Sequence, residues 1–540
     1  MSRPLRSSGV EQCASMDSSP GVQARRHPNQ PAHHDRYVVE SGLDLVLLVI
    51  GVLCATLMQT LDTTIVNVAL PTIQGNLGAS QDEGAWVFTG YIISAVIVIP
   101  LTPWLQLRFG RRQYYATAVI GFTIASIFCG FATNITELIV WRIIQGLFGG
   151  GLIATAQATL RDTFPPEKLG ASQAIFALGA IVGPSIGPTI GGWLTDNFSW
   201  NYVFFINIVP GTFAATILLL RLKNPTDPKR IPVDGIGLGL LALGLGALQY
   251  ILDEGQRHDW FSDPLLVCLA LVAASGLSAF IAWELWGTNN PIVDLRVLRH
   301  RAAAAGAALG FMMGAVLFGA TIILPQYVQG LLGFTATLSG ELIFVRAFFI
   351  ALGTPIMARL VGSGRIDARI LIALGFVGVG ISQWWLGLVT TTGNTLGSLL
   401  PPLILGGIAI SCIFTPLSIS VLRALPQALA PKAAAFQSLS LQLGGSFSTA
   451  GLITLLARRS ALHLSRLAGA INPTRLPVQT ALQHHASVGQ LAALVEKQAT
   501  VLAYADCQYV LGALTFLLLP CVLVLPRYQQ NAGPIEISAE

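Results

Sequence analysis

The stretch DLVLLVIGVLCATLMQTLDTTIV, residues 44–66, is apolar over most of its length but contains a carboxylate, Asp62, near its end. About 20 residues of α-helix cross the hydrocarbon core of a bilayer, which is roughly 30 Å thick. Charged residues make up 11% of the chain and its mean hydropathy is +0.66. A soluble domain has roughly 25% charged residues. The segment therefore predicts a membrane-spanning helix, and the composition predicts a chain built mainly of such helices.

Thirteen further segments have the same length and character. The predicted helices, with boundaries good to about 4 residues, are 44–66, 85–105, 115–133, 137–158, 172–195, 202–222, 235–252, 264–285, 303–323, 337–358, 368–388, 398–422, 434–457 and 507–525. An even number of spans places both termini on one side. Lys and Arg are concentrated in alternate loops, and this bias predicts that those loops and both termini are cytoplasmic.

Two parts of the chain share a short pattern, which suggests an internal repeat. Leu70–Gly78 reads LPTIQGNLG and Leu324–Gly333 reads LPQYVQGLLG. Transporters are often built from such repeats, with the substrate site between them. The predicted organisation is a disordered cytoplasmic tail (1–42), an N-terminal six-helix bundle (43–222), an inserted transmembrane hairpin with flanking cytoplasmic loops (223–300), a C-terminal six-helix bundle (301–526) with a long external loop (458–506), and a cytoplasmic tail (527–540).

Several motifs, in order along the chain, point to one family. They include LDTTIVNVALP (61–71), RIIQGLFGGG (142–151), GAIVGPSIGPTIGG (179–192), FFINIVPG (204–211) and LDEGQRHDWF (252–261). The chain resembles the fourteen-helix drug:proton antiporters of the major facilitator superfamily, the EmrB/QacA group. The resemblance implies an all-α integral membrane protein with two six-helix bundles and an inserted hairpin. It also implies export of lipophilic, possibly cationic compounds from the bacterial inner membrane, driven by the proton gradient with no cofactor.

Asp62 and Arg142 are the candidate proton-coupling residues. A carboxylate inside a spanning helix costs about 2.5–3.5 kcal/mol to insert, so such residues usually have a function. The two charges fall at comparable depth on helices of the same half. Pairing with a guanidinium favours the charged carboxylate, and separation favours its protonation. The family resemblance implies the same role, although a buried pair can also serve helix packing alone.

Two further motifs follow from the resemblance. The antiporter motif of the fifth predicted helix consists of Gly179, Gly183, Pro184, Gly187, Pro188, Gly191 and Gly192. Glycine at every fourth position permits close helix packing, and the resemblance implies that this face leans on the opposite half and controls leak. The cytoplasmic loop motif consists of Arg108, Gly110, Arg111 and Arg112. Here Pro103 and Leu107 replace the Gly and Asp usual in the family, which questions any gate that relies on that carboxylate.

Other polar residues within the spans are candidates for a substrate cavity. They are Asn67, Gln145, Asn207, Gln326, Arg346 and Gln442. Polar groups scattered in an otherwise apolar cavity suit a binder of varied hydrophobic compounds. Arg346 needs a partner or a water-filled cavity, and Glu341, five residues before it, lies about 140° away around the helix. These two are therefore not expected to pair.

The sequence also bears on partners and on other classes of function. The external loop at 458–506 contains the amphipathic stretch QLAALVEKQATVLAYAD (490–506), and the resemblance implies docking of a membrane-fusion (HlyD-like) adaptor and an outer-membrane channel. No Walker A motif occurs, which argues against ATP as the energy source. No cysteine, histidine or carboxylate set has metal-ligand spacing, and nothing indicates nucleic-acid binding or an enzyme active site. An exporter of one specific metabolite and a non-transporting membrane sensor remain as alternatives.

Overall fold

A computed structural model describes residues 42–164, 168–224, 232–288, 291–363, 366–426, 429–469, 488–517 and 519–525. Within these ranges all regular elements are helices, and no strand occurs. The predicted tails at 1–42 and 527–540 lie outside the described residues, except for Gly42, which begins the first helix.

The first half and the hairpin follow the predicted order. Their helices are α1 (Gly42–Leu77), α2 (Gln81–Val98), η1 (Ile99–Leu101), α3 (Thr102–Phe109), α4 (Arg111–Phe131), α5 (Ile135–Gly149), α6 (Leu152–Thr163), α7 (Leu169–Asn197), α8 (Tyr202–Phe205), α9 (Ile208–Arg221), α10 (Gly235–Glu254), η3 (Trp260–Ser262), α11 (Pro264–Ala282), η4 (Trp283–Gly287) and η5 (Leu295–Arg299). Several predicted spans consist of two consecutive helices, such as α5 with α6.

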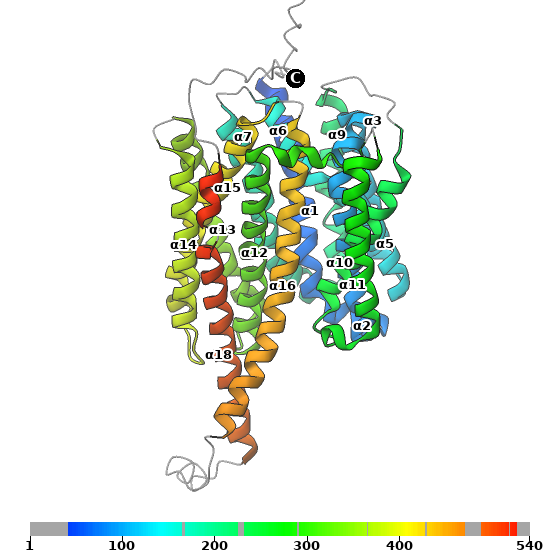
Figure 1. Ribbon diagram of the computed structural model, residues 1–540. Coiled ribbons are helices and arrows are strands. Elements are labelled where there is room, and N and C mark those ends of the chain that lie inside the picture. The colour runs from blue at the N-terminus through cyan, green and yellow to red at the C-terminus, as the bar shows by residue number, and fades with distance from the viewer. Residues whose placement is uncertain are drawn as a thin grey trace, which may run out of the picture. The chain divides into compact units, whose positions relative to one another are not determined.

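The second half contains the remaining helices (Figure 1). They are α12 (Arg301–Gly330), α13 (Ala336–Gly362), α14 (Ala368–Val389), α15 (Leu396–Arg423), α16 (Ala430–Ala468), α18 (Val488–Leu517) and η7 (Leu519–Val524). In the described ranges, thirteen segments are long and apolar enough to cross a membrane. The Gly- and Pro-rich α7 adds a further helix of 29 residues, in agreement with the prediction of about fourteen.

The repeated LP…QG-x-LG pattern ends two helices in the same way. Gly78 follows α1 with φ +62°, and Gly333 lies just beyond α12 with φ +72°. Glycine is the residue that adopts positive φ without steric cost, so it suits both sites. A backbone hydrogen bond stabilises the turn at each helix end. Ala79 N–H donates to the Gln74 carbonyl (2.9 Å), and Phe334 N–H donates to the Val328 carbonyl (3.0 Å). The sequence echo therefore corresponds to a shared local geometry.

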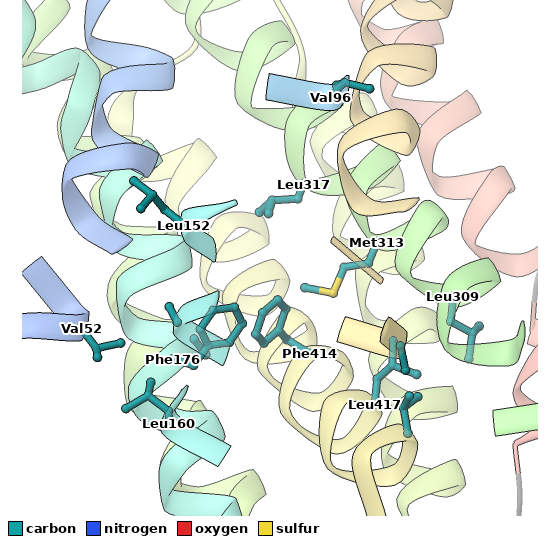
Figure 2. Close-up of a cluster of buried hydrophobic side chains, with 14 of the residues drawn as sticks. Val52, Val96, Leu152, Leu160, Phe176, Leu309, Met313, Leu317, Phe414 and Leu417 are labelled. Atoms are coloured by element: carbon teal, nitrogen blue, oxygen red, sulfur yellow. The ribbon is translucent and has the colours of Figure 1, made fainter. Parts of the chain in front are cut away.

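Apolar side chains from both halves meet in one core. Phe176 of α7 stacks on Phe414 of α15, with ring centroids 5.8 Å apart. Figure 2 shows Leu152 on one side of this pair and Met313 and Leu317 on the other. Lipid tails are as apolar as these side chains, so close van der Waals packing rather than removal from water stabilises the contact between the helices. In the described part of the chain, the two halves are thus held together by a continuous apolar cluster near their centre.

The predicted hairpin is not isolated from the two halves. Its first helix, α10, packs against α11 and also against α2 and α16. Trp86 of α2 and Tyr250 of α10 have ring centroids 5.3 Å apart. On the other side, the indole N–H of Trp260 donates to the hydroxyl of Thr454 in α16 at 3.0 Å. Within the described residues, the hairpin therefore contacts both halves.

The prediction of a long loop at 458–506 is wrong for the described part of that segment. Residues 458–468 continue α16, residues 488–506 begin α18, and 470–487 lie outside the described residues. The two helices pack along each other and continue past their neighbours at the lower edge of Figure 1. Contacts there include His463 Nε2 to Asp506 Oδ2 at 2.9 Å. Mutual packing of amphipathic faces is what lets both helices extend beyond their apolar spans.

We expect Gly444→Ala to destabilise the protein because α16 crosses α12 there with its backbone in contact. An added Cβ would lie 2.7 Å from the carbonyl carbon of Phe311, which is backbone and cannot rotate away. Overpacking of this kind typically costs about 1–3 kcal/mol. Gly451→Ala on the same helix meets nothing within 4 Å and is the control. Thermal unfolding in detergent should show a lower midpoint for Gly444→Ala alone; equal midpoints would contradict this crossing.

Candidate functional site

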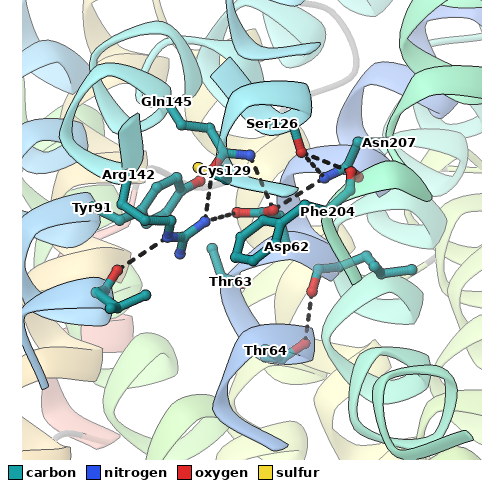
Figure 3. Close-up of polar contacts among 12 residues, drawn as sticks. Asp62, Thr63, Thr64, Tyr91, Ser126, Cys129, Arg142, Gln145, Phe204 and Asn207 are labelled. Atoms are coloured by element: carbon teal, nitrogen blue, oxygen red, sulfur yellow. Dashed lines mark hydrogen bonds and ion pairs between the residues drawn. The ribbon is translucent and has the colours of Figure 1, made fainter. Parts of the chain in front are cut away.

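Asp62 lies on α1 between two half-buried residues, and its own side chain points into the protein. Its side chain is 0% exposed, as is that of Arg142 on α5. Arg142 Nη1 and Asp62 Oδ2 are 2.6 Å apart. The ionic pair predicted from the helix order is therefore formed, and it lies wholly inside the first half (Figure 3).

The second oxygen of Asp62 is held by two amides. Gln145 Nε2 donates to Oδ1 at 3.1 Å, and Asn207 Nδ2 donates to the same atom at 3.0 Å. Gln145 lies one turn after Arg142 on α5, and Asn207 is the residue that precedes α9. Asn207 is itself positioned by Ser126 Oγ at 3.0 Å, a contact to α4. Asp62 thus accepts bonds from three side chains, which together replace the water it lost on burial.

Arg142 has further partners that do not depend on Asp62. Its Nε donates to the Val87 carbonyl of α2 at 3.0 Å, and its Nη1 donates to Gln145 Oε1 at 2.8 Å. The guanidinium carbon lies 4.3 Å from the ring centroid of Tyr91. A ring face attracts a cation, and more strongly in a desolvated site. Arg142 can therefore stay charged and solvated by protein groups while Asp62 is neutral.

This arrangement is suited to binding and releasing one proton. With Asp62 ionised, the two charges cancel and the carboxylate is fully hydrogen-bonded. Separation of α1 from α5 would leave the carboxylate without its cation, and protonation would then relieve the cost of a buried charge. The geometry can thus couple helix movement to proton occupancy.

The contacts of Gln145 and Asn207 differ from those predicted from the sequence. Both were predicted to line a substrate cavity, but their amides bind Asp62. Asn67 and Gln326 are exposed, and Gln442 is half-buried. The described structure does not bring these three to the Asp62 cluster. Periodicity reveals that a helix is spanning, but it does not identify which polar side chain meets which neighbour.

The glycine face of α7 packs against α1, not against the opposite half, so that expectation is wrong in this conformation. A Cβ on Gly179 would lie 3.1 Å from Thr56, and Gly183 and Gly187 face the hydroxyls of Thr60 and Thr64 in the same way. The remaining motif residues, Pro184, Pro188, Gly191 and Gly192, are buried or half-buried along the same helix. Small residues allow this close approach to the turn that carries Asp62.

The opposite half contacts α7 at other positions. A Cβ on Gly340 of α13 would lie 3.2 Å from Cγ2 of Thr189, and α7 and α13 pack extensively. The helix therefore has α1 on one side and α13 on the other. It connects the Asp62 turn with the second half.

The basic loop motif has a carboxylate partner that the sequence pattern did not predict. Arg111 begins α4, and its Nη1 lies 2.6 Å from Asp162 Oδ2 on α6. Gly110 before it has φ +83°, and the backbone N–H of Arg112 donates to Asn224 at 2.8 Å.

The remaining arginine of the motif, Arg108, and a nearby arginine, Arg161, complete this end of the bundle. Arg108 lies over the ring of Trp104 at 5.8 Å. Arg161, next to Asp162, donates to the Leu422 carbonyl of the second half at 2.9 Å. A link between halves is therefore present although Leu107 replaces the usual Asp.

Arg346 on α13 is a buried cation with a neutral partner. Its Nη2 donates to Thr321 Oγ1 of α12 at 2.7 Å, and its side chain is 5% exposed. In the described residues no carboxylate forms an ion pair with it, and Glu341 is exposed, as expected for two residues on different sides of the helix. Arg346 is thus a buried cation of the second half that could attract an anion.

Sequence reasoning missed Ser126, Tyr91 and the Val87 carbonyl. Ser126 donates to the Phe204 carbonyl at 2.8 Å and accepts from Asn207, so it connects α4 with the segment before α9. A serine or tyrosine in a spanning helix is too common to stand out. The only available signal was the spacing of Arg142 and Gln145, three residues apart and hence on one helix face.

Comparisons with known proteins identify the family of this chain. The chain matches the Major Facilitator Superfamily over residues 52–449. It is 35% identical over 433 residues to the multidrug export protein EmrB of Escherichia coli (strain K12), covering 80% of this chain and 84% of EmrB. It is 33% identical over 505 residues to the fatty acid resistance protein FarB of Neisseria gonorrhoeae, covering 91% and 98%.

A solved structure shows the same fold at low sequence identity. The human organic anion transporter MFSD10 aligns with a TM-score of 0.59 and 12% identity, covering 88% of this chain and 99% of that one. The fold, the motifs and the length of the matches agree, and they indicate a transporter rather than an enzyme. The chain is a multi-pass membrane protein that belongs to the Major Facilitator Superfamily, among its EmrB-like members.

Proposed function

We propose that this protein is a multidrug exporter that exchanges lipophilic compounds for protons. The observation that carries the proposal is the buried Asp62–Arg142 pair, formed at 2.6 Å with both side chains fully inaccessible. A relative of similar length, at 35% identity, is named a multidrug export protein. The energy source would be the proton gradient, without a cofactor. Both termini would be cytoplasmic, in the inner membrane of a bacterium.

In this proposal α7 transmits the state of Asp62 to the second half. The helix packs on Thr60 and Thr64, which flank Asp62. It also packs on α13, the helix that carries Arg346. Protonation of Asp62 would weaken its attraction to Arg142, and a shift of α1 would then move α7. Tight glycine contacts make such a movement collective, because packed helices rearrange between discrete positions.

Arg346 supports a substrate range that includes organic anions. An unpaired cation in the membrane favours a ligand that carries negative charge, and the relative FarB is named for resistance to fatty acids. Lipophilic cations remain within the proposal, because Arg346 lies on α13 of the second half, apart from the Asp62 pair that would exchange the proton. Transport of anions should therefore depend on Arg346 more than transport of cations does.

The proposal is tested in everted membrane vesicles with an acidic interior. Addition of a lipophilic cation, or of a lipophilic carboxylate of matched size, should discharge the proton gradient only when the protein is present. Arg346→Gln should impair the response to the carboxylate more than the response to the cation. Failure of every compound in a broad panel would contradict drug:proton exchange.

The same assay separates the alternatives. Competition among unrelated compounds supports a multidrug exporter, whereas a response to one compound alone would indicate an exporter of a specific metabolite. Binding without any proton movement would indicate a sensor that does not transport.

We also propose that α16 and α18 dock a membrane-fusion adaptor of a three-part export system with an outer-membrane channel. A helix of 39 residues, such as α16, is about 58 Å long and exceeds the roughly 30 Å hydrocarbon core. α16 packs against α18, and the two helices form a pair that extends beyond the membrane-spanning part of the protein. Such a pair offers a surface that transport itself does not require.

Shortening this pair should separate transport from adaptor binding. The hydroxyls of Ser460 and Thr500 lie 3.2 Å apart, so the chain can be cut there and closed by a short Gly-Ser linker in place of 461–499. Proton exchange in vesicles should persist, while co-purification with the adaptor and drug resistance of intact cells should be lost. Retention of adaptor binding by the shortened protein would contradict this docking surface.

A further inference from the structure

A second intramembrane carboxylate lies in the hairpin and takes no part in the Asp62 cluster. Asp253 is near the end of α10, and its Oδ1 accepts from Gln249 Nε2 at 2.9 Å, one helical turn earlier. Its Oδ2 is buried without a hydrogen-bond partner among the described residues. Gln249 is 0% exposed, and its Oε1 is also buried without a partner.

The two atoms without a partner, Asp253 Oδ2 and Gln249 Oε1, are both hydrogen-bond acceptors. The group that the site lacks is therefore a donor. Leaving a buried acceptor unsatisfied costs about 1–3 kcal/mol, more for a charged group. A protonated carboxyl has one O–H donor. A proton on Asp253 Oδ2 would supply a donor to Gln249 Oε1, while Gln249 Nε2 continues to donate to Oδ1. A single proton would thus satisfy both atoms and close a cyclic acid–amide pair.

Among the described residues, α2, α11 and α16 place no cation against Asp253, and the nearby Arg257 pairs with Glu254. Thr89 of α2 faces the carboxyl, and α16 contributes Ser446, whose hydroxyl accepts from Gln249 Nε2 at 2.9 Å. In α11 the described helix Pro264–Ala282 contains no charged side chain.

The ionisable group adjacent in the chain is the carboxylate of Glu254, which binds Arg257 at 3.3 Å. The charged side chains of α2 lie in its first turn, and those of α16 lie toward its two ends. Asp253 is half-buried as a whole, but its Oδ2 is buried, and a carboxylate oxygen buried without an opposite charge favours protonation of the group.

The site is distinct from the Asp62 pair. Arg142 binds the carbonyl of Val87, whereas Asp253 faces Thr89, two residues further along α2. Two residues turn a helix by about 200°, so the two sites lie on opposite sides of α2. Through Gln249 and Ser446 the second site also reaches α16 of the other half.

We propose that Asp253 and Gln249 form a second proton-binding site, in which a neutral Asp253 fastens the inserted hairpin between α2 and α16. The inference goes beyond drug:proton exchange and does not depend on it. A proton held here stabilises the contact of the hairpin with both halves. Loss of that proton would leave a buried charge at the junction and would loosen it.

Infrared spectroscopy of the purified, reconstituted protein tests the site without any transport. At neutral pH, wild type should show the C=O stretch of a protonated carboxyl that is lost in Asp253→Asn. Glu254→Gln is the matched control, since Glu254 is the adjacent buried carboxylate and has Arg257 as a partner; its spectrum should keep the band. Equal bands in wild type and Asp253→Asn would overturn the proposal.

A second variant keeps the test valid if Asp253→Asn folds poorly. Gln249→Leu removes the amide, so the acid C=O loses a hydrogen bond and its band should move to higher frequency. An unchanged band would overturn the proposal. The thermal stability of Asp253→Asn is a further test. An asparagine can donate one hydrogen bond and accept another, as a protonated aspartic acid does, so it can take the place of the neutral acid. Asp253→Asn should therefore unfold at the same temperature as wild type or higher, and a large decrease would indicate that Asp253 is ionised.

Discussion

Vesicles containing Asp62→Asn are expected to show no substrate-induced discharge of the proton gradient, and their response should equal that of vesicles without the protein. The amide oxygen of the asparagine can keep the bond to Arg142, but its NH2 group then faces the Gln145 and Asn207 donors, which must reorient, and the asparagine cannot carry a proton. The fold should survive, because Arg142 retains the Val87 carbonyl, Gln145 and the Tyr91 ring.

The control for this experiment is a carboxylate outside the spanning core. Asp162→Asn removes the partner of Arg111 at the other polar cluster of the same half, and it should retain proton exchange even if its stability falls. Full exchange by Asp62→Asn, at normal expression, would remove Asp62 from the coupling step.

Arg142→Gln is expected to have the largest effect on stability of any single substitution in the site. Removal of one partner from a buried ion pair typically costs about 3–5 kcal/mol, because the other charge is left uncompensated. Here Asp62 would keep only the Gln145 and Asn207 amides. Thermal unfolding in detergent should show a clear decrease in the midpoint for Arg142→Gln and a smaller one for Asp62→Asn.

The double variant Asp62→Asn/Arg142→Gln measures the coupling of the pair directly. Loss of both charges removes the uncompensated carboxylate, so its midpoint should lie above that of Arg142→Gln alone. Transport should stay absent. Additive losses in the double variant would mean that the two charges do not interact energetically.

Much of the fold could be predicted from the sequence, because each spanning helix needs about 20 apolar residues and such runs are easy to recognise. The pairing of Asp62 with Arg142 was also predictable, since intramembrane charges are few and each needs a partner. The extent of α16 and α18 was not, because their distal parts are amphipathic and polar enough to read as a loop. Their stability comes from packing on each other, which hydropathy does not report.

The contacts within the site depend on how the helices pack in three dimensions, which local sequence does not report. Gln145 and Asn207 could have faced a cavity or a carboxylate, and only the positions of α5 and α9 around α1 decide between them. The glycines of α7 correctly predicted a close contact with another helix. They did not predict that this helix is α1. The carboxylate partner of Arg111 lies on α6, more than 50 residues away in the sequence, and no local sequence pattern predicts this pairing.

Proton exchange by the purified protein in weakly buffered detergent solution tests the role of Asp62 most directly. Addition of a transported substrate should change the pH in proportion to the substrate bound, and the change should vanish in Asp62→Asn while Asp253→Asn retains it. This result would assign the exchanged proton to the Asp62–Arg142 pair. An undiminished pH change in Asp62→Asn, with substrate still bound, would contradict the account.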